Sequence, residues 1–507
     1  MPAKGRNPRA GLNHRIAVID IGSNSIRLVV YDALNRAPVQ LFNEKVLCGL
    51  GRELGETGRL NPEGVKSAFI HLERFVSLAR SIGVRRLDAM ATAAVRDAVD
   101  GRAFIGEVRR RCRISVKILS GQDEGRLSAL GLIAGIPEAR GVMGDLGGGS
   151  VELVGVGGGK AGTGVTVPLG PLRLSEFQND ERRLRSVLDR YIDSVDWLGR
   201  RRGETFYAVG GAWRALARIH MEQVFYPLHV IQGYRLLRRD AEDFLTVMAG
   251  LSRRSLEKIT TVSRKRLETV PLAALVLRRI IRAMEPESVV FSAYGLREGH
   301  LYDLLPERRR REDPLLAACQ SIARSHRRFG LGGDELHHWI APLFDRNDPF
   351  SRLRHAAACL GDVAWNEHPD YRAEQAFRYA LYMPVVGLDH RERAFVAAVL
   401  HSRYGGPDGS VREVVHRLID EETAASARAT GLALRLAYTL SGGVPKLLPD
   451  APLSREGGIL TLNLPADGPL QTGETVERRL AALGRALGCE SRVIRVAPMP
   501  RKRARAG

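Results

Sequence analysis

The chain of 507 residues is 44% hydrophobic and 26% charged, and its formal net charge is +20 at pH 7. This length predicts two to four soluble domains, each able to bury its own core. No uninterrupted apolar run approaches the ~18 residues of a membrane span, which argues against a membrane protein. The positive charge attracts polyanions such as nucleic acid, an anionic membrane surface or polyphosphate, and by itself it does not choose among them.

The cysteines and the N-terminus indicate a cytoplasmic protein. The five cysteines are scattered and form no Cys-x-x-Cys pair, which favours buried, reduced thiols. Residues 1–13 read as a basic arm without an apolar segment that ends in a cleavage site. We therefore expect neither a disulfide framework nor a secretory leader.

Two segments share one pattern, in which an apolar strand runs into an aspartate, a short turn of glycine and polar residues follows, and a second strand begins. The first has Asp20 before Gly22-Ser-Asn-Ser25, and the second has Asp145 before Gly147-Gly-Gly-Ser150. Glycine lacks a β-carbon, so the backbone N–H groups of such turns can approach an anion closely. An ordinary β-hairpin turn explains either loop alone, but the pair predicts a duplicated domain with a cleft between its halves.

Two carboxylates flank the second of these turns. Asp145 precedes it, and Glu152 lies in the strand that follows. Carboxylates do not bind phosphate directly, but they hold a divalent cation or orient a water molecule beside it. A phosphate loop between two acids indicates metal-assisted phosphoryl chemistry.

The segment between the two turns alternates between strand and helix patterns, as in an α/β domain. Asn61 followed by Pro62 indicates a helix start, with a side-chain cap and proline at the first helical position. The elements predicted in this segment are strands at 41–47, 86–91 and 114–119 and helices at 61–80, from 93 and from 123.

Two strand-to-helix junctions carry polar residues suited to catalysis or to anion binding. Ser120 can cap the next helix, with Asp123 and Glu124 in the first turn, where negative charge is favoured by the helix dipole. Helix capping accounts for one of these two acidic residues but does not require the other. Thr92 and Arg96 suit phosphate contact as well as an ordinary cap with an ion pair.

The rest of the chain predicts further α/β structure and then a helical region. Residues 207–213 form a strand that ends in Gly210-Gly211 before a helix, a third place where backbone amides can meet phosphate. The charged run 307–313 reads as a link that ends at Pro314. Beyond it the pattern is helical to about residue 445, and residues 456–497 read as a small β/α piece.

Six motifs in unbroken order over residues 15–305 resemble the exopolyphosphatase / guanosine pentaphosphate phosphohydrolase family. They are Asp20-Ile-Gly-Ser-Asn-Ser, Ala91-Thr-Ala-Ala-Val-Arg-Asp-Ala, Ser120-Gly-Gln-Asp-Glu-Gly-Arg-Leu, Asp145-Leu-Gly-Gly-Gly-Ser-Val-Glu-Leu, Gly210-Gly211 and Tyr294-Gly-Leu-Arg-Glu-Gly299. The resemblance implies an α/β protein of the actin-like ATPase superfamily, with two ribonuclease-H-like domains (14–136 and 137–306) around a cleft. It also implies that residues 314–507 hold an α-helical, degenerate HD-like domain with a small α/β C-terminal piece.

The same resemblance implies Mg²⁺ as cofactor and assigns roles to individual residues. Glu124 matches the catalytic acid that orients or deprotonates the attacking water, and Glu152 matches a second important carboxylate. Asp145, Glu152 and Asp20 are implied to lie beside the metal. The residues implied to bind substrate are Ser23, Asn24, Ser25, Arg96, Gly147, Gly148, Gly149, Ser150, Gly210, Gly211 and Arg266. Ala212 stands where many relatives have threonine, so one hydroxyl contact is absent.

The helical region lacks the His-Asp dipeptide that a working HD site needs for its metal, and Gly361-Asp362 stands in its place. His355, Asp362, His368 and His401 could still form a metal site. Structural histidines on a helical domain are the expectation.

The resemblance predicts an exopolyphosphatase that acts on inorganic polyphosphate, and the net charge modestly favours a long polyanion over a single nucleotide. The close alternative is hydrolysis of guanosine pentaphosphate in the same site. An ATP-binding chaperone or actin-like filament protein would share the second glycine turn but not the motifs at 120–127 and 294–299. A nucleic-acid-binding module would explain the charge but not the paired carboxylates. The resemblance further implies a homodimer, and no membrane association is expected.

Overall fold

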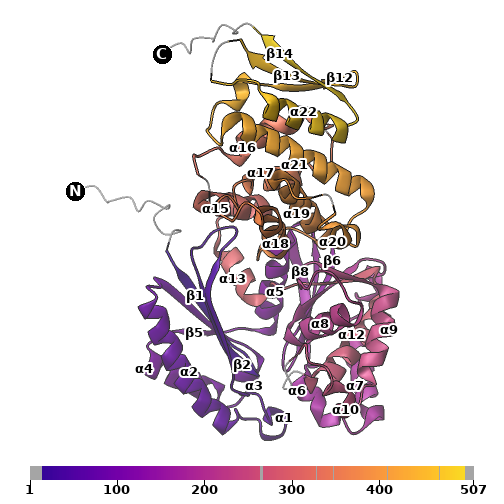
Figure 1. The fold of residues 1–507 in the computed structure, drawn as a ribbon. Helices are drawn as coiled ribbons and strands as arrows, with labels where there is room; N and C mark the ends of the chain where they lie inside the picture. The colour runs from indigo at the N-terminus through magenta and orange to yellow at the C-terminus, as the bar shows by residue number, and fades with distance from the viewer. Residues whose placement is uncertain are drawn as a thin grey trace, which may run out of the picture. The chain divides into compact units, whose positions relative to one another are not determined.

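A computed structural model describes residues 14–262, 267–326, 328–345, 347–407, 409–466 and 469–496. The chain divides into two compact units, of which the first ends at Glu312 and the second begins at Asp313 (Figure 1). All five cysteines are free thiols. No helix of the described residues has both the length and the apolar character that crossing a membrane requires.

The first sheet of the first unit has the strand order β3-β2-β1-β4-β5. Its strands are β1 (Ile16–Ile21), β2 (Ser25–Tyr31), β3 (Gln40–Leu47), β4 (Arg86–Ala91) and β5 (Val116–Ile118). β1 pairs antiparallel with β2 and parallel with β4, so the sheet is antiparallel on one side of β1 and parallel on the other. β1 is almost wholly buried, as expected for a central apolar strand covered on both faces.

The second sheet repeats this arrangement and adds one edge strand, in the order β10-β11-β9-β6-β7-β8. Its strands are β6 (Gly141–Leu146), β7 (Val151–Gly157), β8 (Lys160–Val167), β9 (Thr205–Gly210), β10 (Tyr234–Leu237) and β11 (Ser288–Phe291). β6 pairs antiparallel with β7 and parallel with β9, as β1 does with β2 and β4. The Asp–glycine turns seen in the sequence therefore connect the same two strands in each sheet.

Helices cover both sheets and fill the space between them. α2 (Pro62–Ser81) and α4 (Gly101–Cys112) pack on one face of the first sheet. α5 (Gly121–Gly135) and α13 (Leu296–Leu304) share one apolar core with strands of both sheets (Figure 1). The helices on the far face of the second sheet are α7 (Glu181–Asp193), α8 (Gly211–Gln223), α9 (Arg238–Ala249) and α12 (Val270–Met284). Shorter helices of this unit are α1 (Leu54–Thr57), α3 (Ala93–Asp97), α6 (Pro171–Leu174), α10 (Arg253–Leu256) and α14 (Glu307–Arg310).

The helices α5 and α13 approach each other more closely than β-carbons would allow. A β-carbon added at Gly131 of α5 would lie 2.0 Å from the carbonyl oxygen of Gly295. One added at Gly299 of α13 would lie 1.7 Å from the carbonyl oxygen of Leu127. Both distances are far below van der Waals contact, so this crossing requires glycine on both helices.

The second unit is helical with a small sheet. Its longer helices are α15 (Pro314–His326), α16 (Gly333–Ile340), α17 (Ser351–Cys359), α18 (Arg372–Tyr382), α19 (His390–Tyr404), α21 (Glu421–Ser441) and α22 (Glu474–Ala486), with the short α20 (Arg412–His416) between α19 and α21. α19 packs against α18 and α21, and α22 packs on α21. Three strands, β12 (Leu453–Glu456), β13 (Ile459–Pro465) and β14 (Glu490–Val496), form a sheet in the order β12-β13-β14.

Most of the elements predicted from the sequence are confirmed. The Asn61 side chain accepts a hydrogen bond from the Gly64 N–H at 2.9 Å, and Pro62 is the first residue of α2. The helix predicted from residue 93 begins there but ends at Asp97, and α4 starts separately at Gly101. The chain turns sharply between them, since a β-carbon at Gly101 would lie 1.9 Å from the Val95 carbonyl oxygen. The glycine rather than the helical pattern decides this break.

Replacing Gly131 with alanine is expected to destabilise the first unit by about 1–3 kcal/mol, because the added methyl group meets the backbone of α13. The matched control is Gly106→Ala in α4, where a β-carbon has no heavy atom within 4 Å. That change should stabilise by about 0.5–1 kcal/mol, since alanine is the better helix former. Midpoints of thermal unfolding that shift in the same direction for both variants would contradict the close crossing.

Candidate active site

The turns of the two equivalent hairpins face a cavity of about 230 Å³ in the first unit. Both turns are closed by the same hydrogen bond, in which the Gly22 N–H donates to the Ser25 carbonyl and the Gly147 N–H to the Ser150 carbonyl, each at 3.0 Å. The predicted site residues that line this cavity are Asp20, Ser23, Asn24, Ser25, Glu124, Asp145, Gly147, Gly148, Ser150, Gly210 and Gly211. The structure therefore brings together residues from four separate sequence motifs.

The two turns present backbone N–H groups that an anion could use. Within the described part of the chain, no acceptor takes the N–H groups of Ser23, Asn24, Gly148 or Gly149. The Gly148 loop is held in place from behind, because the Leu172 N–H donates to the Gly148 carbonyl at 2.9 Å. Such paired, fixed amides form an anion-binding concavity.

A third group of amides comes from the start of α8. Its N-cap, Gly210, has φ 113 and no side chain that could satisfy the first helical turn. A β-carbon at Gly210 would lie 2.5 Å from the Leu146 carbonyl oxygen, so glycine is required there by conformation and by space. The uncapped, positive end of this helix opens into the cavity.

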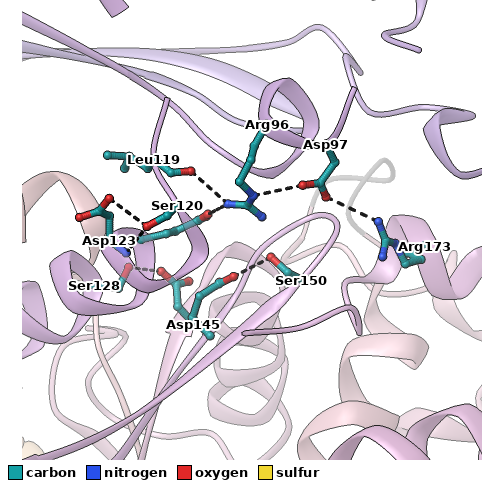
Figure 2. Close-up of polar contacts among 11 residues, drawn as sticks. Arg96, Asp97, Leu119, Ser120, Asp123, Ser128, Asp145, Ser150 and Arg173 are labelled. Atoms are coloured by element: carbon teal, nitrogen blue, oxygen red, sulfur yellow. Dashed lines mark hydrogen bonds and ion pairs between the residues drawn. The ribbon is translucent and has the colours of Figure 1, made fainter. Parts of the chain in front are cut away.

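Glu124 occupies the first turn of α5, and the predicted helix cap is confirmed. The Ser120 Oγ accepts from the Asp123 N–H at 3.1 Å and donates to the Asp123 carboxylate at 2.9 Å (Figure 2). Asp123 is thus the acid that capping uses, which leaves Glu124 for another role. The residue is 7% exposed, and its Oε2 accepts from Arg96 Nη1 at 3.2 Å.

The neighbouring carboxylates belong to the second hairpin. Asp145 and Glu152 face each other across β6 and β7. Ser128 of α5 donates to Asp145, and the Ser150 Oγ donates to Glu152 Oε1 at 2.6 Å. Glu152 is 1% exposed and lies behind the cavity wall, and its Oε2 has no partner among the described residues.

Burial and mutual repulsion keep these acids from ionising easily. Burial, and then the charge of Asp145, raise the pKa of Glu124 from 4.5 to about 7, although Arg96 opposes the shift. Burial and the charge of Glu124 raise the pKa of Glu152 well above its usual value. Burial also raises the pKa of Asp145 and of Asp20. A carboxylate whose pKa lies near neutrality can accept a proton at physiological pH.

Four basic side chains that the sequence did not single out also line the cavity: Arg27, Lys45, Arg214 and Arg297. Arg297 lies 3.5 Å from Asp20, and Arg214 donates to the Ala293 carbonyl at 2.7 Å. The hairpin register could have identified Arg27, which stands across from Asp20. Arg297 falls within the Tyr294–Gly299 motif, but no local pattern marks Arg214 or Lys45 as site residues.

Two predicted substrate-binding residues, Arg96 and Gly149, do not line the cavity, and a third lies outside the described residues. Arg96 is directed at its own neighbours, with Nε 3.1 Å from Asp97 and Nη1 donating to the Leu119 carbonyl at 3.3 Å (Figure 2). Gly149 borders an adjacent, smaller hollow. Arg266 lies outside the described residues.

The donor set of the cavity is compatible with Mg²⁺. Asp20, Glu124 and Asp145 line the cavity together, so a bound cation would reduce the repulsion among their charges. Glu152 Oε2 is a buried acceptor without a partner among the described residues. In the described residues, no three acidic, histidine or cysteine side chains are placed to hold a metal ion by themselves. Mg²⁺ usually takes only one or two carboxylates, with water and substrate phosphates as its other ligands. Asp145, with Asp20 or Glu152, would supply them.

The histidines of the second unit have other partners. His355 lies 2.7 Å from Asp334, His401 lies 3.0 Å from the Ser410 hydroxyl, and the His368 ring accepts from the Asp370 N–H at 3.3 Å. Asp362, of the Gly361-Asp362 pair that stands in place of the His-Asp dipeptide, lies 3.1 Å from Arg328. The described structure does not gather these four residues into a metal site.

The fold and the cavity together define a phosphatase with an actin-like arrangement of two α/β sheets. The chain belongs to the Ppx/GppA phosphatase family, whose sequence profile matches residues 16–308. Residues 340–494 match a second profile, described as "Exopolyphosphatase, C-terminal".

Individual relatives agree with this family. The chain is 28% identical over 305 residues to exopolyphosphatase 1 of Mycobacterium tuberculosis, covering 56% of this chain and 86% of that protein. It is 26% identical over 432 residues to retrograde regulation protein 2 of Saccharomyces cerevisiae, covering 77% and 72% of the two chains. The crystal structure of an exopolyphosphatase from Cytophaga hutchinsonii shares the fold, with 23% identity, a TM-score of 0.53 and coverage of 57% of this chain and 97% of that one.

Substitution of Glu124 by glutamine is expected to lower kcat by about 10²–10⁴-fold while leaving the fold intact, because the amide keeps the shape but cannot accept a proton. The matched control is Asp123→Asn in the same helical turn, which should retain activity. Phosphate release and circular dichroism measure the two effects. More than half of wild-type kcat in the Glu124 variant would rule out this role.

The raised pKa of Glu124 predicts a pH-dependent stability difference. Its folded-state pKa of about 7 lies above the unfolded value of 4.5, so the folded state binds the extra proton and loses stability as pH rises between these values. Without divalent cations, the free energy of unfolding of Glu124→Gln should be close to that of the wild type near pH 5. At pH 8 it should be higher than that of the wild type by on the order of 3 kcal/mol. Thermal unfolding at both pH values tests this, and a difference independent of pH would contradict it.

Proposed function

We propose that the protein is an exopolyphosphatase, which hydrolyses the terminal phosphate of inorganic polyphosphate by metal-assisted attack of water. The observation that carries this proposal is the position of Glu124, a buried carboxylate with a pKa of about 7. It lines a cavity beside two turns whose Ser23, Asn24, Gly148 and Gly149 amides have no acceptor among the described residues. The names of the mycobacterial relatives and of the C-terminal profile support polyphosphate as the substrate.

In this proposal the terminal phosphate lies against the amides of the two hairpin turns, with the side chains of Ser23, Asn24, Ser25 and Ser150 beside it. Gly147, Gly148 and Gly149 contribute backbone, Gly210 and Gly211 open the end of α8 towards the substrate, and Arg96 and Arg266 bind the phosphate chain. To bind the phosphate chain, the Arg96 side chain must either break its contact with Glu124 or contact Glu124 and the substrate at the same time.

Glu124 orients a water molecule and takes its proton as the oxygen attacks the terminal phosphorus. The bond to the bridging oxygen breaks, and the shortened polyphosphate leaves. Arg214 and Arg297 lie where they can stabilise negative charge on the transferred group. When bound by Asp145 with Asp20 or Glu152, Mg²⁺ would neutralise phosphate oxygens and polarise the phosphoryl group.

The proposal extends to the architecture. We assign residues 14–136 and 137–306 to two ribonuclease-H-like domains, in keeping with the shared strand order of the two sheets. Residues 314–507 would form a degenerate HD-like helical domain with an α/β C-terminal piece. Free cysteines support a cytoplasmic location, and the family resemblance supports a homodimer.

The test is phosphate release from long-chain polyphosphate and from guanosine pentaphosphate, measured side by side with Mg²⁺ and with EDTA. We expect rapid, Mg²⁺-dependent release from polyphosphate. Release from guanosine pentaphosphate alone would replace the proposed substrate, and tight ATP binding without any release would replace the proposed reaction.

The salt dependence of binding, measured at fixed free Mg²⁺, tests whether the protein binds a long chain or only a short one. If the charge of +20 serves a long polyanion, log K should fall by about 0.7–0.9 per phosphate neutralised for each unit of log[salt]. Guanosine pentaphosphate contacts fewer basic side chains and should show a shallower slope. Equal slopes would contradict extended binding of the polymer.

A further inference from the structure

A second cavity of the first unit, of about 640 Å³, shares no lining residue with the active-site cavity. It lies where the end of α2 and the strands β4 and β5 meet α5 and α13. Arg86 begins β4, whereas Thr92 of the active-site cavity follows its last residue, a separation of about 20 Å along the strand. Its volume is within the range of small-molecule binding sites.

The wall of this second cavity is strongly basic. Two carboxylates, Asp88 and Asp303, also line it, and both are already paired. Asp88 lies 2.9 Å from Arg86 and 2.8 Å from His300, and Asp303 lies 2.9 Å from Arg126. The basic residues that line the cavity are Arg80, Arg85, Arg86, Arg113, Lys117 and Arg126.

Four of these cations have no acidic partner in the described part of the chain. Arg80 donates to the Cys112 carbonyl at 3.4 Å, and Arg85 lies 3.3 Å from the His14 ring. Arg113 and Lys117 flank the start of β5, and both are exposed. Positive charges that line one cavity repel one another, and an anion between them would relieve that repulsion.

The backbone of Arg113 is also unusual. Arg113 follows the last residue of α4 with φ 56, in the left-handed region where glycine or asparagine is usual. An arginine at this position places a long basic side chain at the rim of the cavity, at a cost in backbone energy that glycine would avoid.

Apart from Ser115, the rest of the wall is apolar and includes Val84, Met90, Leu119, Leu127 and Leu304. A cavity with an apolar side and four cations that lack an acidic partner among the described residues suits a chain of several phosphates, with or without a nucleoside attached. A single phosphate would engage only part of this charge.

We propose that this cavity is an accessory binding site for a phosphate chain of at least two phosphates. The ligand would lie against Arg80, Arg85, Arg113 and Lys117, and any nucleoside would pack on the apolar side. Since α5 and α13 line this cavity and also carry Glu124 and Arg297, its ligand would contact the same two helices that build the active site.

Isothermal titration of the full-length protein with two non-hydrolysable probes tests this site. Methylenediphosphonate represents an inorganic chain, and α,β-methylene-ADP represents a nucleotide. For the wild type we expect two binding events per chain with at least one probe. The double variant Arg113→Asn with Lys117→Gln should weaken one event at least tenfold and leave the other unchanged, and asparagine retains the left-handed backbone.

The matched control is Arg182→Gln with Arg239→Gln, which removes the same charge from exposed positions on α7 and α9 outside both cavities. Loss with both probes would show that the site takes inorganic chains and nucleotides alike, and loss with α,β-methylene-ADP alone would assign it to nucleotides. Loss with methylenediphosphonate alone would assign it to inorganic chains. If circular dichroism shows the first variant misfolded, Arg80→Gln with Arg85→Gln replaces it. Identical binding by wild type, cavity variant and control would overturn the proposal.

Discussion

The close packing of α5 against α13 is the constraint on which the active site depends. Gly131 and Gly299 let each helix touch the backbone region of the other, in a layer shared by both sheets. α5 carries Glu124 to the cavity and holds Asp145 through Ser128, and α13 carries Arg297. Glu298 anchors the start of α13, since its carboxylate accepts from the Gly295 N–H at 3.1 Å and from the Tyr31 hydroxyl at 3.0 Å. A small change in this crossing would therefore move acidic and basic site residues together.

The second physical feature of the active site is the concentration of negatively charged side chains in and behind one cavity. Four carboxylates, Asp20, Glu124, Asp145 and Glu152, lie in or directly behind a cavity whose turns and arginines are suited to anions. Burial and repulsion raise the pKa of all four, so their shared negative charge is held at an energetic cost. A cation or a proton reduces that cost, which couples metal binding, proton transfer and phosphate binding in one site.

Many helices and strands could be predicted from the sequence, because a helix cap or a strand pattern depends on residues that are close together in the chain. Asn61-Pro62 marked the start of α2 through the geometry of a helix cap, and the strand 86–91 coincides with β4. The two Asp–glycine turns were recognised from their repeated pattern, and the structure shows them joining equivalent strands. The early end of α3 was not foreseen, because it depends on the contact of Gly101 with Val95 rather than on helical periodicity.

The sequence by itself determined which residues could carry the chemistry: the glycine turns, their flanking acids and the two acids after Ser120. Those signals are local, since they depend on backbone conformation, capping and neighbouring charge. Only the tertiary structure decided which of these residues line the cavity and which support it. Asp123 belongs to the helix cap, whereas Glu124 lines the cavity. Glu152 is buried behind the cavity wall, and Arg96 points towards Glu124. Four different elements add the basic residues Arg27, Lys45, Arg214 and Arg297. Burial and charge at a site are sums over residues far apart in the chain, so no local pattern contains them.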